Sequence, residues 1–186
     1  IIPNSVETIG RYAFEYSNGL TTVSIGHSVS SIGELAFYCT GLTTVYFNAD
    51  SCTNIGGGNT PFYQGFTKLY IGSNVKVMPD NAFRQCYIDT LNFPSSVSRI
   101  GKYAFYFCKL RSIHLNEGLA IIDHLAFCGT ALTSVSIPST VSSIAPGAFA
   151  SCSSISSSTV DNNNETYDSR NNCKAIIQSN NNKIVR

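Results

Sequence analysis

The chain has 186 residues, 43% of them hydrophobic, so it is long enough to bury a substantial core. Only 12% of the residues are charged, and 12 basic residues against 11 acidic ones give a net charge of +1. This balance excludes the electrostatic footprint of a protein that binds nucleic acid or an anionic membrane. No apolar run approaches the roughly 18 residues that a membrane-spanning helix needs.

The dipeptide Ala-Phe recurs along the chain at a nearly constant interval. Its six copies are Ala13-Phe14, Ala36-Phe37, Ala82-Phe83, Ala104-Phe105, Ala126-Phe127 and Ala148-Phe149, and Pro61-Phe62 keeps the Phe. A second apolar anchor recurs in the same register, at Ile9, Ile32, Ile55, Met78, Ile100, Ile122 and Ile144. Chance repetition of Ala-Phe in a β-rich domain does not explain this second anchor. Self-similarity at a period of about 20 to 50 residues indicates a solenoid.

Each repeat contains a short stretch in which apolar and polar residues alternate, which predicts a half-buried strand. The inward pairs are Val23/Ile25, Val45/Phe47, Leu69/Ile71, Leu91/Phe93, Ile113/Leu115 and Val135/Ile137. Successive strands run in the same direction and form a parallel sheet. The I-G-x-x-A-F segment is too short for a stable lone helix. We expect it to cross back through a loop with a 3₁₀ or one-to-two-turn helical segment. The fold class is therefore an α/β-type repeat solenoid over residues 1–160, with about seven repeats of 22–23 residues, the first one truncated.

The third repeat is irregular, with extra residues in the run Gly56-Gly57-Gly58-Asn59-Thr60-Pro61. A phosphate-binding loop would need a G-K-[ST] ending and a following long helix, which the run lacks. We interpret it as a surface turn that absorbs a change in repeat length.

The C-terminal segment 161–186 differs in composition, being rich in Asn and Ser. Two apolar stretches, Ala175-Ile176-Ile177 and Lys183-Ile184-Val185, flank the turn Ser179–Asn182, which predicts a β-hairpin. Such a hairpin would cap the open end of the solenoid core. The alternative is a calcium site at Asp161 and Asp168, although the spacing does not match an EF-hand loop.

Seven cysteines raise the question of disulfides or metal. Cys39, Cys86, Cys108, Cys128 and Cys152 each follow a repeat Phe by one to three residues. We interpret this as a buried periodic position occupied by free thiols, because stacked side chains point in parallel and disfavour a bridge. Cys52 and Cys173 lie outside this pattern. No Cys-x-x-Cys motif is present, and we expect no metal and no cofactor.

The outward strand positions form a polar face with little charge. These positions are Thr22/Ser24, Thr44/Tyr46, Lys68/Tyr70, Thr90/Asn92, Ser112/His114 and Ser134/Ser136. Tyr46 and Tyr70 fall on neighbouring repeats, and Tyr is common at the centres of protein interfaces. The alternative is that they reflect β-propensity alone. The candidate ligand-binding residues are Tyr46, Asn48, Lys68, Tyr70, Asn92 and His114.

No group of residues supports catalysis. His114 lies on a strand, His27 follows one and His124 adjoins Asp123, and none is set in a Ser-His-Asp or Cys-His pattern. We therefore expect that the protein is not an enzyme.

The consensus I-P-x-S-V-x-x-I-G-x-x-A-F-x-x-C-x-x-L-x-x-V resembles the BspA-type leucine-rich repeat. It is carried here by Ile2 to Val23 and by Pro94 to Ile113, and the run Tyr167 to Ile177 resembles a segment of Bacteroides-type members. Departures from it are Pro61 for Ala, Met78-Pro79 for Ile-Gly, and Asp123 and Ala145 for that Gly. The resemblance implies a secreted or surface-anchored bacterial or protozoan protein, in some cases linked to adhesion, with no shared catalytic residues.

Two functions are consistent with these features. The first is an extracellular or cell-surface module that binds a host or bacterial surface protein, or a glycan, through the sheet face. The second is a structural spacer that holds another domain away from the cell. The chain begins inside a repeat, so we expect a mature fragment or an ordered part of something longer.

Overall fold

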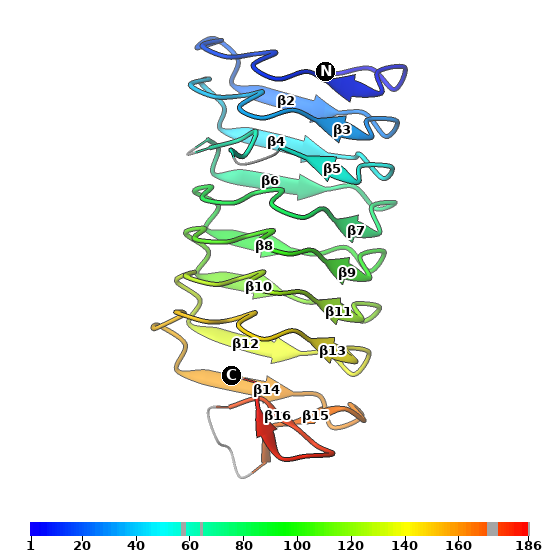
Figure 1. Ribbon diagram of the computed structural model, residues 1–186, viewed down its shortest axis with the longest axis vertical. Coiled ribbons are helices and arrows are strands. Elements are labelled where there is room, and N and C mark those ends of the chain that lie inside the picture. Colours follow the sequence, from blue (N-terminus) through cyan, green and yellow to red (C-terminus); the bar gives the residue numbers. More distant parts are fainter. Residues whose placement is uncertain (57–58, 64, 171–174, 186) are drawn as a thin grey trace.

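The computed structural model describes residues 1–56, 59–63, 65–170 and 175–185. The chain winds into an elongated stack of similar turns, with the N-terminus at one end and the C-terminal segment at the other (Figure 1). The predicted solenoid is therefore confirmed. Within the described ranges, no helix is long and apolar enough to cross a membrane.

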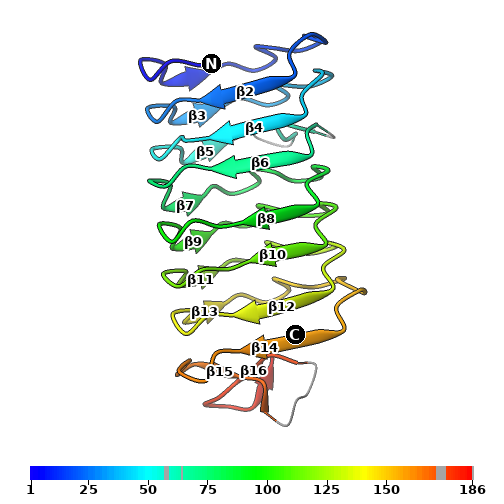
Figure 2. The same ribbon diagram turned by 180° about the vertical axis from the view of Figure 1, so that it is seen from behind.

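One long side of the stack is a row of parallel strands, seen from the front in Figure 2. They are β2 (Thr22–Ile25), β4 (Thr44–Phe47), β6 (Lys68–Ile71), β8 (Thr90–Asn92), β10 (Ser112–His114), β12 (Ser134–Ile137) and β14 (Ser157–Val160). The predicted register is confirmed, since Val23, Val45 and Leu69 are paired across β2, β4 and β6 and all three are buried. This row is the sheet face of the molecule.

A second row of two-residue strands lies on the opposite side of each turn, which the repeat pattern did not predict. These strands are β1 (Thr8–Ile9), β3 (Ser31–Ile32), β5 (Asn54–Ile55), β7 (Val77–Met78), β9 (Arg99–Ile100), β11 (Ile121–Ile122) and β13 (Ser143–Ile144). The second apolar anchor of each repeat ends one of them. Every described anchor is buried, so these residues hold the back of the core.

The expectation of short 3₁₀ or helical segments in the crossovers is wrong, since these consist of turns throughout their described parts. The reason is a pair of left-handed residues in every crossover that carries Ala-Phe, one directly before the Ala and one two residues after the Phe. In the fifth repeat these are Tyr103 (φ 56°) and Phe107 (φ 53°). A left-handed residue interrupts the run of right-handed residues that a helix requires.

This backbone conformation directs alternate N–H groups along the stack. Tyr103, Phe105 and Phe107 donate to carbonyl oxygens of the next repeat, at 2.8–3.1 Å. The residues between them close local turns, as in the bond from Ala104 N to Gly101 O (3.2 Å). The inter-repeat bonds offset the cost of the left-handed residues, which is about 1–2 kcal/mol each for a side chain other than Gly.

The repeated phenylalanines form one continuous aromatic stack through the core. Adjacent rings from Phe14 to Phe149 have centroids 4.9–5.7 Å apart and are inclined by at most 24°. This spacing is close to the separation of paired strands, about 4.8 Å, so each turn contributes one ring in register with the next. The Ala-Phe repeat therefore builds the central column of the core.

The backbone ladders are interrupted at three places, and each coincides with a proline. The breaks separate β5 from β7, β6 from β8, and β10 from β12. In unbroken parts, the residue after a strand donates its N–H to the preceding turn, as from Gly72 to Phe47 O (2.8 Å). At the three breaks the equivalent residue is a proline, which has no N–H to donate: Pro79 directly after β7, Pro94 two residues after the end of β8, and Pro138 directly after β12.

The C-terminal segment forms an antiparallel sheet of β15 (Tyr167–Asp168), β16 (Ile177–Gln178) and β17 (Lys183–Ile184) below the last turn. The predicted hairpin of β16 and β17 is confirmed. The buried Tyr167 hydroxyl accepts a hydrogen bond from Ile144 N (2.7 Å), and Ser169 Oγ accepts one from Val160 N (3.2 Å). These side chains replace the partners that a further turn would supply, so the segment caps the stack.

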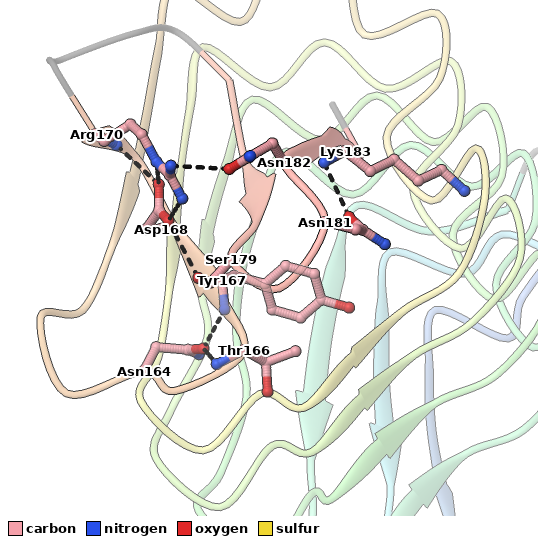
Figure 3. A network of polar contacts seen from close by, with 9 residues as sticks. All are labelled: Asn164, Thr166, Tyr167, Asp168, Arg170, Ser179, Asn181, Asn182 and Lys183. Atoms are coloured by element: carbon pink, nitrogen blue, oxygen red, sulfur yellow. Dashed lines mark hydrogen bonds and ion pairs between the residues drawn. The ribbon is translucent and has the colours of Figure 1, made fainter.

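Polar contacts hold the cap in shape (Figure 3). Asn164 accepts from the N–H groups of Thr166 (2.9 Å) and Tyr167 (2.8 Å) and donates to Pro138 O (2.7 Å). Arg170 forms an ion pair with Asp168, and its hydrogen bonds hold the pKa of that carboxyl well below its usual range. Among the residues that the structure describes, no three His, Cys, Asp or Glu side chains converge as a metal site would require.

We expected the five cysteines that follow a repeat Phe to share one buried position, and this expectation is wrong for Cys39. Cys86, Cys108 and Cys152, three residues after the Phe, are buried and direct their thiols at the Phe carbonyl of the preceding repeat (3.4, 2.7 and 3.1 Å). Cys39 lies two residues after its Phe, at a left-handed position, and is exposed. Cys128 is buried, as is Cys52, and Cys173 lies outside the described residues.

Burial makes Cys86 and Cys108 poor nucleophiles. Desolvation raises the pKa of Cys86 well above its ordinary value and raises that of Cys108 to about 12. Because the thiolate is the reactive form, iodoacetamide at pH 8 should label Cys39 in the native protein and leave Cys86 and Cys108 unmodified. Peptide mapping by mass spectrometry measures this, with labelling in guanidinium chloride as the control. Equal labelling rates at Cys39 and Cys108 in the native state would contradict it.

Candidate interaction surface

Two tyrosines stand together on the sheet face. Tyr46 on β4 and Tyr70 on β6 are directly paired across the strands, and both point outward because they alternate with buried residues. Their rings stack with centroids 4.9 Å apart and an inclination of 13°. Tyr46 is 41% exposed and Tyr70 51%, so the pair presents a large, oriented aromatic surface to solvent.

A hollow lies beside this pair, over the break between β6 and β8. It has a volume of about 610 Å³ and is open to solvent. Its lining includes the predicted residues Lys68, Tyr70 and Asn92. The structure therefore brings together four of the six predicted residues, with Tyr46 supporting Tyr70 from the β4 side.

The other two predicted residues belong to neighbouring surfaces. His114 pairs with Asn92 across β8 and β10, but it lines a second recess of about 290 Å³ with Glu117 and Asp161. Asn48 lies at the end of β4, where its amide donates to Ser24 Oγ (3.4 Å), and it lines a third recess with His27. The six residues thus share one side of the stack without forming a single site.

Several lining residues were not among the predicted binding residues. Asp89, Thr90, Phe93 and Pro94 line the main hollow, and the recess beside His114 includes Pro138. The signal that could have found them is a proline within two residues of a strand's end, because that proline interrupts the ladder where the hollow forms.

The charges around the main hollow nearly balance. Lys68 lies on one side and Asp89 on the other, and Asp89 is 3.5 Å from Arg111 (Oδ1 to Nε). Thr90 donates to the same carboxylate (3.4 Å). The surface is therefore suited to a ligand without strong net charge.

A model of the BspA type leucine-rich repeat region matches residues 1–98 and 76–183, in six copies. The chain belongs to the BspA-type leucine-rich repeat family. The matched ranges include all the strands of the sheet face and most of the cap.

Solved bacterial proteins have a similar fold. A leucine-rich cell surface protein from Faecalibacterium prausnitzii is 28% identical, with a TM-score of 0.63, over 97% of this chain and 49% of that one. A leucine-rich repeat protein from Bacteroides ovatus is 18% identical, with a TM-score of 0.65, over 86% and 48%. The pneumococcal vaccine antigen PcpA is 19% identical, with a TM-score of 0.58, over 86% and 40%. The chain spans less than half the length of these proteins, and no curated protein matches it.

Proposed function

We propose that this leucine-rich repeat protein is an extracellular or cell-surface module that binds a macromolecular partner, without catalysis, through its sheet face. The observation that carries the proposal is the stacked pair Tyr46–Tyr70 on a face that is otherwise polar. Tyrosine brings a large apolar area with a polar tip, at a small cost in side-chain entropy. The similarity to a cell surface protein of F. prausnitzii supports the location.

The proposal assigns different roles to the two parts of the chain. Residues 1–160 form the binding solenoid, and residues 161–186 close its end so that the core is covered. The partner is a surface or extracellular protein of a host or of another bacterium. The family and the paired, outward-facing tyrosines support this role over that of a spacer, which has no need of an oriented aromatic pair.

The test is a double substitution on the sheet face. Purified protein is measured against immobilised extracellular-matrix and bacterial surface proteins by biolayer interferometry. We expect Tyr46→Ala with Tyr70→Ala to weaken binding by about tenfold or more, as for the loss of an aromatic anchor, with an unchanged melting temperature. The matched control is Tyr12→Ala with Tyr16→Ala, which removes two exposed tyrosines from the crossovers.

Two outcomes would contradict the proposal. If the Tyr46/Tyr70 variant binds an identified partner as well as the parent protein does, the site lies elsewhere. If the parent protein binds none of the proteins offered, the spacer function is favoured instead.

A further inference from the structure

The break between β6 and β8 leaves a backbone acceptor without its usual donor. On the two preceding strands, the carbonyl oxygens of Ile25 and Phe47 accept from Asn48 N (3.2 Å) and Gly72 N (2.8 Å). The equivalent oxygen is that of Ile71, and the equivalent donor position is Pro94, which has no N–H. The hollow is lined by both residues, so a ligand placed there has a backbone oxygen to which it can donate.

The break also opens the edge of the core. Ile25 and Phe47 are completely buried, whereas Ile71, at the same position of its strand, is partly exposed. The floor of the hollow is therefore a mixture of apolar side chain and polar backbone.

One wall of the hollow is an aromatic ring face. Tyr46 covers the side of the Tyr70 ring that is turned toward β4, and the two rings are nearly parallel. The opposite face of Tyr70 is therefore turned toward β8, where the equivalent outward position carries the smaller Asn92. Stacking on Tyr46 also holds the ring upright, so this face is presented to a ligand with little loss of entropy on binding.

The hollow also carries polar side chains, whose charges nearly balance. Lys68, Asp89, Thr90 and Asn92 offer donors and acceptors around the single ring. A ligand that fits this arrangement has one apolar face to lie on Tyr70 and several hydroxyl groups at its rim, without net charge. A pyranose ring has these properties.

We propose that the hollow between β6 and β8 binds a neutral sugar residue of a glycan. This inference rests on the proposed function, because it names the chemistry that the sheet face recognises on its partner. The sugar ring stacks on Tyr70, its hydroxyl groups donate to the Ile71 carbonyl oxygen and to Asp89, and Lys68 and Asn92 donate to its oxygens.

The shape of the hollow favours a sugar over an apolar protein side chain. Protein hot spots are well-packed pockets from which water is excluded around an inserted anchor. This hollow is open and is bordered on both sides by charged residues, so it would not desolvate such an anchor. Sugar hydroxyl groups remain partly hydrated when bound and do not need an enclosed site.

The experiment is a titration of the purified protein with cellohexaose, maltohexaose, mannohexaose and chitohexaose, followed by saturation-transfer-difference NMR and calorimetry. We expect at least one of the four to bind, and Tyr70→Ala to weaken that binding by about tenfold, the effect of losing one aromatic stacking contact with its buried area. Tyr70→Phe keeps the ring and should bind within about threefold of the parent protein, since only an exposed hydroxyl is lost. Tyr12→Ala is the control for a general loss of aromatic surface.

The outcomes separate this inference from the proposed function. The inference is overturned if none of the four oligosaccharides binds at millimolar concentration, or if Tyr70→Ala leaves binding unchanged. A protein partner that still binds after periodate oxidation of its glycans, and loses binding to the Tyr46/Tyr70 variant, would support the proposed function and exclude the sugar. Binding of an oligosaccharide without any protein partner would support the inference alone.

Discussion

Phe105→Ala should lower the free energy of unfolding by about 3–5 kcal/mol, the usual cost of removing a large buried aromatic side chain. The ring is completely buried and lies in the middle of the phenylalanine stack, with Phe83 at 5.7 Å and Phe127 at 5.5 Å. Phe93 also packs edge-on against it, at 5.6 Å. Its loss therefore leaves a cavity that faces both neighbouring repeats.

Thermal unfolding followed by circular dichroism measures the effect. For a chain of this size, the expected loss corresponds to a decrease in melting temperature of about 6–20 °C. A repeat protein is held together by the interfaces between adjacent repeats, so a central cavity can also divide unfolding into two transitions. Separate unfolding of the two halves would show that the phenylalanine stack couples them.

Phe107→Ala is the matched control. It removes the same side chain two residues further along the same crossover, where the ring is 49% exposed and contacts Tyr106 with a centroid distance of 4.6 Å. We expect a loss of about 1 kcal/mol, from that one aromatic contact. Equal destabilisation by the two substitutions would contradict the central role of the stack.

Tyr167→Phe should destabilise the last turn by about 1–3 kcal/mol, the cost of leaving a buried donor without its acceptor. The substitution removes one oxygen atom, the acceptor for Ile144 N at 2.7 Å, and keeps the buried ring. Strand β13 is the terminal strand of its sheet, so no further strand can replace this acceptor. The effect should be confined to the capped end of the stack.

Hydrogen exchange measured by NMR tests this prediction residue by residue. The amide of Ile144 should exchange faster in the variant, whereas the amide of Ile32, near the other end, should keep its rate. Tyr16→Phe serves as the control, because it makes the same change at a residue that is 64% exposed. An unchanged rate at Ile144 would mean that the cap does not depend on this hydrogen bond.

The repeated residues were sufficient to predict the architecture. The spacing of Ala-Phe and of the second apolar anchor predicted the solenoid, and the alternation of residues such as Val45, Tyr46 and Phe47 predicted which side chains face out. These inferences hold because one strand per repeat, stacked in register, buries every repeated apolar residue in the same way. The hairpin of the cap was predicted for a similar reason, since two short apolar stretches flank a polar turn.

The crossovers were less predictable because their form depends on partners in the next repeat. Nothing in Tyr103 or Phe107 as residue types favours a left-handed conformation. They adopt it because their N–H groups then reach carbonyl oxygens of the following turn. The exposure of Cys39 has the same origin, since a left-handed residue two positions after the Phe turns its side chain away from the core.

By itself, the sequence determined the repeat, the core column, the polar outward face and the place of the cap. Only the tertiary structure decided where that face is hollowed. Pro79, Pro94 and Pro138 look alike in the sequence, yet each interrupts a ladder whose other strand lies a whole repeat earlier in the chain. A hydrogen bond between turns involves two residues that only the winding of the chain brings together, so the loss of one becomes visible only when the turns are stacked.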